Sequence, residues 1–311
     1  MSDIILHHYP LSTFSEKARL ALGLKGLSYR HVIVPVVSPK PDQVALTGGY
    51  RRAPVMQIGA DIYCDTHLIL RKLEQMFPSP SLFPNNSQGE ATVLSWWAER
   101  YVFMPALGFI ANVNSELYPD DFAAERKDFG YLLGKKDVAP LFNRYIQQFV
   151  AHTVWLKSIL ADGRPYLLGE AISAADLAAY PSIWFLRKWG PVEAQQWLDI
   201  APLLAWVDRV AAIGHGNPTE IAAAVALEVA RSSTPALFAI EPDSDPTGLK
   251  AGMSVTVTPD DVGRDPVVGI LLGADDQEVI IQRTDPRAGT VNVHFPRVGY
   301  DVVEIHKTAK T

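Results

Sequence analysis

Residues 51–66 read RRAPVMQIGADIYCDT, and they give the clearest indication of the fold of the N-terminal part. Two short, mostly apolar runs lie at residues 54–58 and 61–64. Gly59-Ala60 between them is typical of a tight turn, so the two runs predict a β-hairpin. Asp65-Thr66 then opens a segment whose apolar residues recur at helical spacing. The stretch therefore predicts two antiparallel strands followed directly by a helix.

The sequence upstream of the hairpin predicts a strand at residues 4–6, a helix at 15–25 and a second strand at 29–37, followed by a proline-rich loop. The predicted order is βαβ, a loop, then ββα. Residues 79–88 hold turn formers without periodicity, which is typical of a linker. We therefore expect a first domain at residues 1–80.

The residue pattern changes twice along the rest of the chain. Residues 89–231 show aromatic-rich helical patterns without convincing β alternation, and Ser173-Ala174-Ala175-Asp176 fits a capping box, so this part predicts an all-helical domain. Residues 236–311 predict a small all-β, barrel-like domain, because they hold β-rich runs separated by Gly, Pro and Asp turns. The runs are residues 253–258, 267–272, 278–283, 290–295 and 300–305.

Composition narrows the classes of partner. The chain has 311 residues and a formal charge of -6, with no basic stripe, so nucleic acid is not expected. Cys64 is the single cysteine, which excludes an intramolecular disulfide and favours a reducing cytoplasm; no metal cluster is expected from it. The sequence starts without a signal-peptide pattern, and no apolar run approaches the roughly 20 residues of a bilayer span. We expect no membrane association.

Four local segments carry a resemblance to a known family. Residues 12–20 read STFSEKARL, similar to a serine-type motif between a first strand and a first helix. Arg52-Ala53-Pro54-Val55 matches a segment whose proline is cis, and Asp65-Thr66 stands where a Glu-Ser pair is common. Leu168-Gly169 and the capping box that follows fit a motif of a helical domain. Jointly these segments resemble the glutathione transferase superfamily, with a serine motif similar to its tau, zeta and omega classes.

The resemblance covers roughly residues 3–230 and implies a thioredoxin-like α/β domain followed by an all-α domain. It implies a glutathione-dependent transferase that uses glutathione as co-substrate and acts on a small hydrophobic electrophile. It also implies a two-fold homodimer. The β-rich C-terminal domain lies outside the resemblance.

The resemblance makes Ser12 the catalytic candidate, a hydroxyl that stabilises the glutathione thiolate beside a helix N-terminus. Two alternatives remain open. Ser12 can be a plain N-cap, although Thr13-Phe14-Ser15-Glu16 fits a capping box that would give the cap to Thr13. Tyr9 or His8, near the end of the first strand, can be the donor instead.

The other predicted site residues bind substrate. Thr66 is expected to hold the γ-glutamyl carboxylate and Asp65 the α-ammonium, or either residue simply caps the helix. The main chain of Ala53, presented by cis-Pro54, is expected to pair with the peptide portion of glutathione. The remaining substrate-binding candidates are Lys40 and Arg52 for the glycyl carboxylate, and Phe14 within the serine motif.

A non-catalytic function competes with the transferase hypothesis. Because fold does not fix function, the chain can be a glutathione or ligand carrier, or a scaffold that assembles through its C-terminal domain. The segment Val293–Tyr300 mixes aromatic and cationic groups, which can line a site of its own but more often close a small core. Turnover of an electrophile with glutathione distinguishes the enzyme from the carrier.

Overall fold

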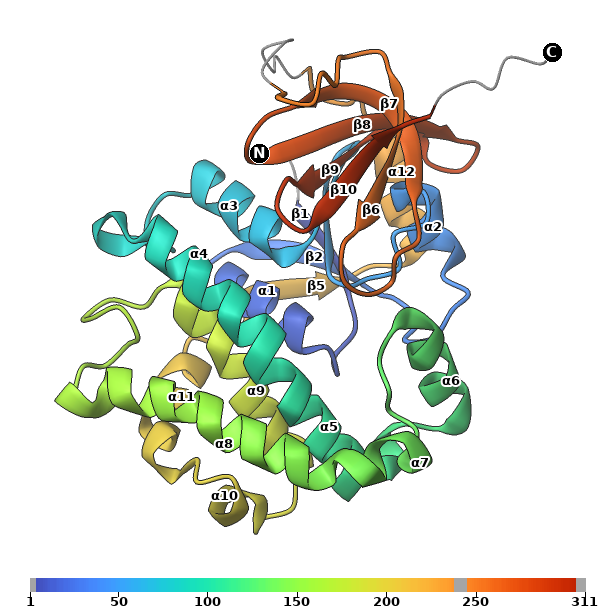
Figure 1. The fold of residues 1–311 in the computed structure, drawn as a ribbon. Coiled ribbons are helices and arrows are strands. Elements are labelled where there is room, and N and C mark those ends of the chain that lie inside the picture. The colour runs from blue at the N-terminus through green and yellow to red at the C-terminus, as the bar shows by residue number, and fades with distance from the viewer. Residues whose placement is uncertain (1–3, 238–244, 306–311) are drawn as a thin grey trace. The chain divides into compact units, whose positions relative to one another are not determined.

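The computed structural model describes residues 4–237 and 245–305, drawn as a coloured ribbon in Figure 1. The chain divides into two compact units. The first unit comprises Met1–Ser12, Ser28–Arg71 and Pro218–Thr311, and the second comprises Thr13–Leu27 and Lys72–Asn217.

The strands are β1 (Ile4–His8), β2 (Ser28–Ile33), β3 (Val55–Ile58), β4 (Asp61–Cys64), β5 (Asn217–Glu220), β6 (Ser254–Pro259), β7 (Val267–Ala274), β8 (Glu278–Asp285), β9 (Gly289–Pro296) and β10 (Tyr300–Glu304). The α-helices are α1 (Thr13–Leu24), α2 (Pro41–Thr47), α3 (Thr66–Met76), α4 (Gln88–Trp97), α5 (Phe103–Val113), α6 (Asp120–Phe129), α7 (Lys135–Val138), α8 (Phe142–Ile159), α9 (Ala174–Trp189), α10 (Ala194–Trp197), α11 (Leu204–Ala211) and α12 (Ala223–Ser232). A π-helical turn, Ala98–Val102, joins α4 to α5. Short 3-10 helices span Pro84–Asn86, Ser115–Leu117, Ala139–Leu141, Leu160–Asp162 and Ala201–Leu203.

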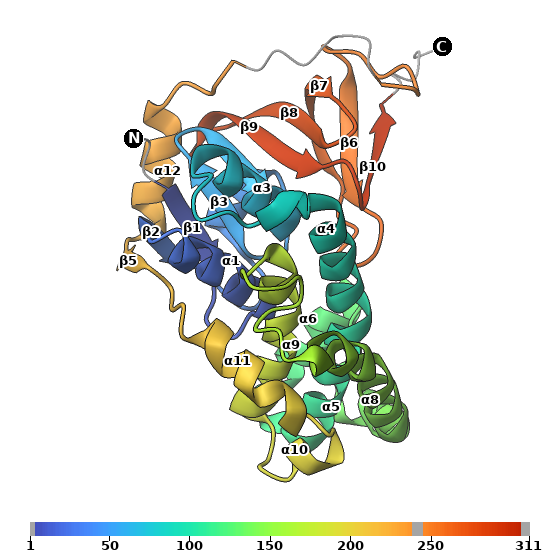
Figure 2. The ribbon, with the colours of Figure 1, turned by 90° about the vertical axis from the view of Figure 1, so that its left-hand side faces the viewer.

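One continuous sheet organises the first unit. Its described strands follow the order β10-β6-β7-β8-β9-β4-β3-β1-β2-β5. Strands β1 and β2 run parallel, β3 and β4 form the antiparallel hairpin predicted at residues 54–64, and β6–β9 form an antiparallel run. The two parts meet where β4 pairs in parallel with β9 (Figure 2). The C-terminal strands therefore extend the sheet of the N-terminal domain.

Polar side chains hold the β4–β9 junction together. Asp61 of β4 accepts hydrogen bonds from the amide of Asn292 at 3.1 Å and lies 3.2 Å from Nε2 of His294, both on β9. The other ring nitrogen of His294 lies 2.6 Å from a carboxylate oxygen of Glu278, and Tyr63 stacks on the imidazole. Because Asn292 and His294 are fully buried, these partners supply the hydrogen bonds that burial demands.

A single apolar core also crosses this junction. It joins side chains of the hairpin, of α12 and of the C-terminal strands, including Val55, Ile62, Leu227, Val257, Val293 and Phe295. Helix α12 packs against α2, β2 and β9. The C-terminal strands thus share an apolar core with the thioredoxin-like sheet. Packing in this core stabilises both parts of the first unit together.

In the second unit, α9 lies at the centre and packs against α1, α4, α5 and α11. The predicted capping box at its start is confirmed, because the Asp176 carboxylate accepts the backbone N–H of Ser173 at 2.9 Å. The same carboxylate also accepts the N–H of Leu167 and the indole N–H of Trp206, each at 2.8 Å. Asp176 therefore ties the start of α9 to α11 and to the preceding loop.

The predicted order of elements is confirmed in both halves, and each of the five predicted C-terminal strands is present. Two expectations are wrong. The loop expected after the second strand contains α2, which starts at Pro41 and ends at Thr47, and the left-handed Gly48 that follows caps the helix. The stretch expected to be wholly helical contains β5, which is hydrogen bonded next to β2. β5 is an exposed edge strand, so it needs no alternation of apolar and polar residues and tolerates Pro218. Among the described residues, no helix is long and apolar enough to cross a membrane.

Acid should destabilise the first unit through His7 of β1. Burial lowers the pKa of His7 from its usual 6.5 to about 4, although its hydrogen bond to Gln57 and the charge of Asp42 act to raise it. The Gln57 amide nitrogen donates to the carbonyls of Gly59 and Ala226, so its oxygen faces Nε2 of His7 at 2.9 Å and accepts the proton on that nitrogen.

Because the unfolded chain takes up this proton first, stability is full above pH ~6.5 and falls as pH drops towards 4. The shift corresponds to about 3 kcal/mol of unfolding free energy. Urea unfolding between pH 7 and 4 measures it, and His7→Asn should flatten the pH dependence. An unchanged pH slope in His7→Asn would contradict the prediction.

Candidate functional site

The end of β4 shapes the first part of the site. Cys64 completes the strand, Asp65 adopts a left-handed backbone with φ of 75°, and Thr66 begins α3. Oδ1 of Asp65 accepts the backbone N–H of His67 at 2.9 Å, so Asp65 caps the helix, as the capping hypothesis predicts. A left-handed residue costs roughly 1–2 kcal/mol, least for Asn and Asp, and such outliers cluster at functional sites.

The second carboxylate oxygen of Asp65 is held from the C-terminal strands. The hydroxyl of Tyr300, the first residue of β10, donates to Oδ2 at 3.1 Å. The hydroxyl of Tyr50 lies 3.0 Å from that of Tyr300. Burial, followed by the charge of Asp65, raises the pKa of both tyrosines well above the ordinary value, so both hydroxyls stay protonated and able to donate. Neither tyrosine was predicted from the sequence to contact Asp65.

The two arginines before the cis proline also meet the C-terminal part of the chain. The Arg52 guanidinium pairs with the carboxylate of Asp261 and the carbonyl of Val262. Arg51 lies 3.3 Å from the carboxylate of Asp265. These acidic residues belong to the connection between β6 and β7. Arg52, one of the two cations expected to bind the glycyl carboxylate, thus already has a carboxylate partner within the chain.

The turn that leads into β3 is held by α2. The Ala53–Pro54 peptide bond is cis, as the resemblance implies. The Gln43 amide donates to the carbonyls of Tyr50 and Arg52 at 3.1 and 2.7 Å. Lys40, which is buried at the N-terminal end of α2, donates from Nζ to the carbonyl of Arg51 at 3.2 Å. Helix α2 therefore fixes the backbone that presents Ala53 and Pro54.

Ser12 directly precedes α1 and is buried, and its backbone N–H donates to the carbonyl of Tyr9 at 3.2 Å. The Glu16 carboxylate, expected to close a capping box with Thr13, accepts from Arg19 with one oxygen, and its other oxygen lies 3.1 Å from His215. Thr13 is the first residue of the helix, so Ser12 stands at the N-cap position. This position places Ser12 beside the amides of the first turn.

The other aromatic and sulfur candidates have packing partners. Nε2 of His8 lies 3.1 Å from Nδ1 of His31. Phe14, on α1 in the second unit, packs edge-on against Phe103 at 5.1 Å between ring centroids. Cys64 is fully buried, and burial raises the pKa of its thiol well above the ordinary value. Cys64 is therefore a protonated core thiol.

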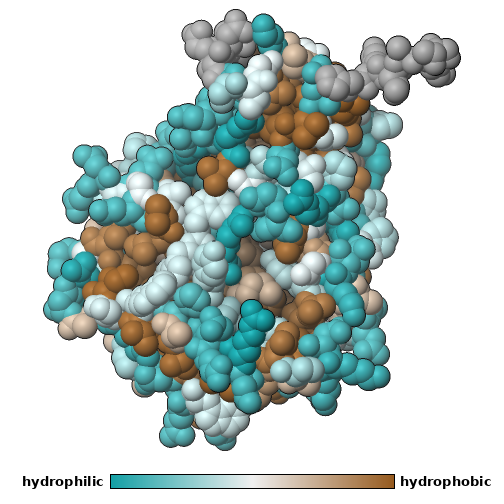
Figure 3. Space-filling view, in the orientation of Figure 1, coloured by the Kyte–Doolittle hydropathy of each residue, from teal (hydrophilic) through white to brown (hydrophobic). Residues whose placement is uncertain are grey.

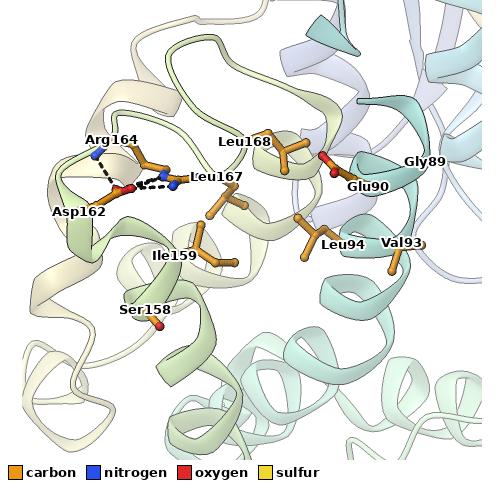
Figure 4. A pocket seen from close by; sticks show the side chains of 10 residues that line it. All are labelled: Gly89, Glu90, Val93, Leu94, Ser158, Ile159, Asp162, Arg164, Leu167 and Leu168. Carbon is orange, nitrogen blue, oxygen red and sulfur yellow. Dashed lines mark hydrogen bonds and ion pairs between the residues drawn. The ribbon is translucent and has the colours of Figure 1, made fainter. Parts of the chain in front are cut away.

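A separate open pocket of about 710 Å³ lies within the second unit. Figure 3 shows apolar side chains gathered over α4 and α8, and Figure 4 shows the pocket lined by both helices and by the segment after α8. The lining residues are Gly89, Glu90, Val93, Leu94, Ser158, Ile159, Asp162, Arg164, Leu167 and Leu168. Arg164 and Asp162 bind each other, so the pocket offers mainly apolar contact. Its volume suits a small molecule.

Comparison with known proteins fixes the family. The glutathione S-transferase N-terminal domain matches residues 6–81, and the C-terminal domain of the same family matches residues 139–209. A solved glutathione transferase-like protein from Pseudomonas syringae is 39% identical; the alignment covers 98% of this chain and 100% of that one, with a TM-score of 0.80. The chain belongs to the glutathione transferase superfamily.

More distant relatives match over shorter stretches. Glutathione S-transferase U4 of Arabidopsis thaliana is 24% identical over 94 residues, which are 30% of this chain and 42% of the plant protein. FtsZ-localized protein A of Caulobacter vibrioides is 25% identical over 207 residues, which are 65% of this chain and 83% of that protein. The relatives thus include one named for a transferase activity and one named for its localisation.

Proposed function

We propose that this superfamily member is a glutathione-dependent transferase that joins the thiolate of glutathione to a small hydrophobic electrophile. The observation that carries the proposal is the start of α3, where a buried Thr66 and a left-handed Asp65 form a polar N-terminus. The same unit holds cis-Pro54 and Ser12. This set has the residue types that a zwitterionic thiol peptide requires.

The proposed role of Ser12 follows from thiol chemistry. A thiol with a pKa near 8.5 is mostly protonated at neutral pH, whereas the thiolate is the nucleophile. A hydroxyl that donates to the sulfur, together with the amides at the start of α1, favours the anion and lowers the thiol pKa. The thiolate then attacks the electrophilic carbon, a carbon–sulfur bond forms, and the leaving group departs with its electron pair.

The charged groups at both ends of the peptide have proposed partners in the chain. The α-ammonium of the γ-glutamyl residue pairs with the Asp65 carboxylate, and the α-carboxylate binds the backbone N–H and hydroxyl of Thr66 at the start of α3. The main chain of Ala53 pairs with the cysteinyl residue. Lys40 and Arg52 remain the proposed cations for the glycyl carboxylate, with Arg52 shared with Asp261.

Turnover tests the proposal directly. Wild type, Ser12→Ala and Thr13→Ala are assayed with glutathione and an activated aryl chloride. We expect Ser12→Ala to lose about 100-fold in kcat, because one anion-stabilising donor is removed. Thr13→Ala, the neighbouring hydroxyl, is the matched control and should stay near wild type. Equal activity of wild type and Ser12→Ala would refute the role of Ser12.

One observation favours the alternative of a non-catalytic ligand carrier or scaffold. Asp65 and Arg52, two of the predicted ligand-binding side chains, already contact the C-terminal strands and the β6–β7 connection. Glutathione binding without turnover of any electrophile would support the carrier.

The homodimer and the cytoplasmic location expected from the sequence stay predictions. Size-exclusion chromatography with light scattering tests the homodimer.

A further inference from the structure

The C-terminal strands contribute a side chain to the predicted glutathione site. Tyr300 is the first residue of β10, and its hydroxyl donates a hydrogen bond to the carboxylate of Asp65. We propose that Tyr300 is a positioning residue, through which the C-terminal strands set the affinity for the γ-glutamyl end of glutathione. This inference rests on the proposed function of Asp65.

The direction of the hydrogen bonds follows from the number of protons. Each tyrosine hydroxyl carries one proton. Tyr300 uses its proton on Oδ2 of Asp65, since a carboxylate can only accept, so Tyr50 must donate to the oxygen of Tyr300. The three residues thus form a directed chain from Tyr50 through Tyr300 to Asp65, and the chain ends on the carboxylate.

This chain leaves Asp65 with capacity for a ligand. A carboxylate offers about four lone-pair sites. The N–H of His67 occupies one site on Oδ1, and Tyr300 occupies one on Oδ2. The remaining sites can accept an ammonium group while both fixed donors hold the plane of the carboxylate. Tyr300 therefore orients the anion without competing for all of it.

The hydroxyl of Tyr300 is itself held rigidly. Its ring lies 5.5 Å from that of Phe295 and 6.4 Å from that of Tyr50, measured between centroids, and all three residues are buried. Tyr300 also pairs with Pro259 at the end of β6, and the connection that follows brings Asp261 to Arg52. One end of the C-terminal sheet thus fastens two predicted ligand-binding residues.

The test compares two thiols. Glutathione carries the γ-glutamyl group, and cysteinylglycine lacks it. In Tyr300→Phe, which keeps the packed ring, we expect KM for glutathione to rise about fivefold to tenfold at unchanged kcat, because a hydrogen bond to a charged group is lost. The kcat/KM for cysteinylglycine should stay at the wild-type value. Tyr50→Phe should show the same pattern more weakly.

Tyr63→Phe is the matched control, because it removes a hydroxyl from a buried ring at the β4–β9 junction that stacks on His294. It should leave both thiols unaffected. Equal KM values for glutathione in wild type and Tyr300→Phe would overturn the inference, and so would a loss of equal size for both thiols. If wild type neither binds nor turns over glutathione, the proposed function itself fails and the inference falls with it.

Discussion

Replacing Phe295 with alanine should lower the free energy of unfolding of the first unit by about 4 kcal/mol. The side chain is fully buried in the core shared by the hairpin, α12 and the C-terminal strands. Its ring meets that of Tyr50 edge-on at 5.9 Å and that of Tyr300 at 5.5 Å. The variant therefore loses apolar burial and leaves a cavity beside Tyr50 and Tyr300.

Denaturant unfolding followed by circular dichroism measures this loss. The matched control is Ile270→Ala, because Ile270 lies on β7 of the same sheet but points a half-exposed side chain to solvent. That variant should stay within about 0.5 kcal/mol of wild type. If Phe295→Ala instead melted the C-terminal strands alone and left the thioredoxin-like part intact, the shared core would be refuted.

Asp176→Ala should destabilise the second unit by a similar amount, about 3–5 kcal/mol. The carboxylate is fully buried and accepts the backbone N–H of Ser173, the N–H of Leu167 and the indole of Trp206. Alanine leaves each of these donors buried without its acceptor, and an unsatisfied buried donor costs more than the hydrogen bond itself contributes.

Asp208→Ala is the control for this variant. Asp208 is a carboxylate that binds Arg187 at 2.6 Å, and its side chain is exposed. Its removal should cost about 0.5 kcal/mol or less, as for other surface ion pairs. Thermal unfolding of both variants gives the comparison. A loss for Asp176→Ala no larger than that for Asp208→Ala would show that the capping box contributes little to stability.

The elements that the sequence predicts are those with local signals. The hairpin at residues 54–64 has an apolar run on each side of a glycine turn, and the capping box at Ser173 has its partner three residues on. Helix α2 escaped prediction because it has only seven residues and thus no periodicity, although Pro41 and Gly48 mark its ends. Strand β5 escaped because an exposed edge strand needs no apolar alternation.

The pairing of β4 with β9 could not be predicted, because it joins residues more than 200 positions apart and no local pattern encodes it. A signal existed nonetheless. Asn292 and His294 are polar residues inside an otherwise apolar strand, and such residues need buried partners. The sequence indicated Asp65 and Thr66, because they lie at the start of a predicted helix. It did not indicate Tyr50 and Tyr300 as their neighbours, because these two residues come close to Asp65 only when the chain is folded.

The most direct measurement of the proposed site is calorimetric titration of glutathione into wild type, Ser12→Ala and Thr13→Ala, with thiolate absorbance followed between pH 5 and 9. We expect wild type and Thr13→Ala to bind glutathione and to show thiolate at neutral pH. Ser12→Ala should bind but show thiolate only near the free thiol pKa of about 8.5. Absence of binding to wild type at millimolar glutathione would contradict a glutathione site in this chain.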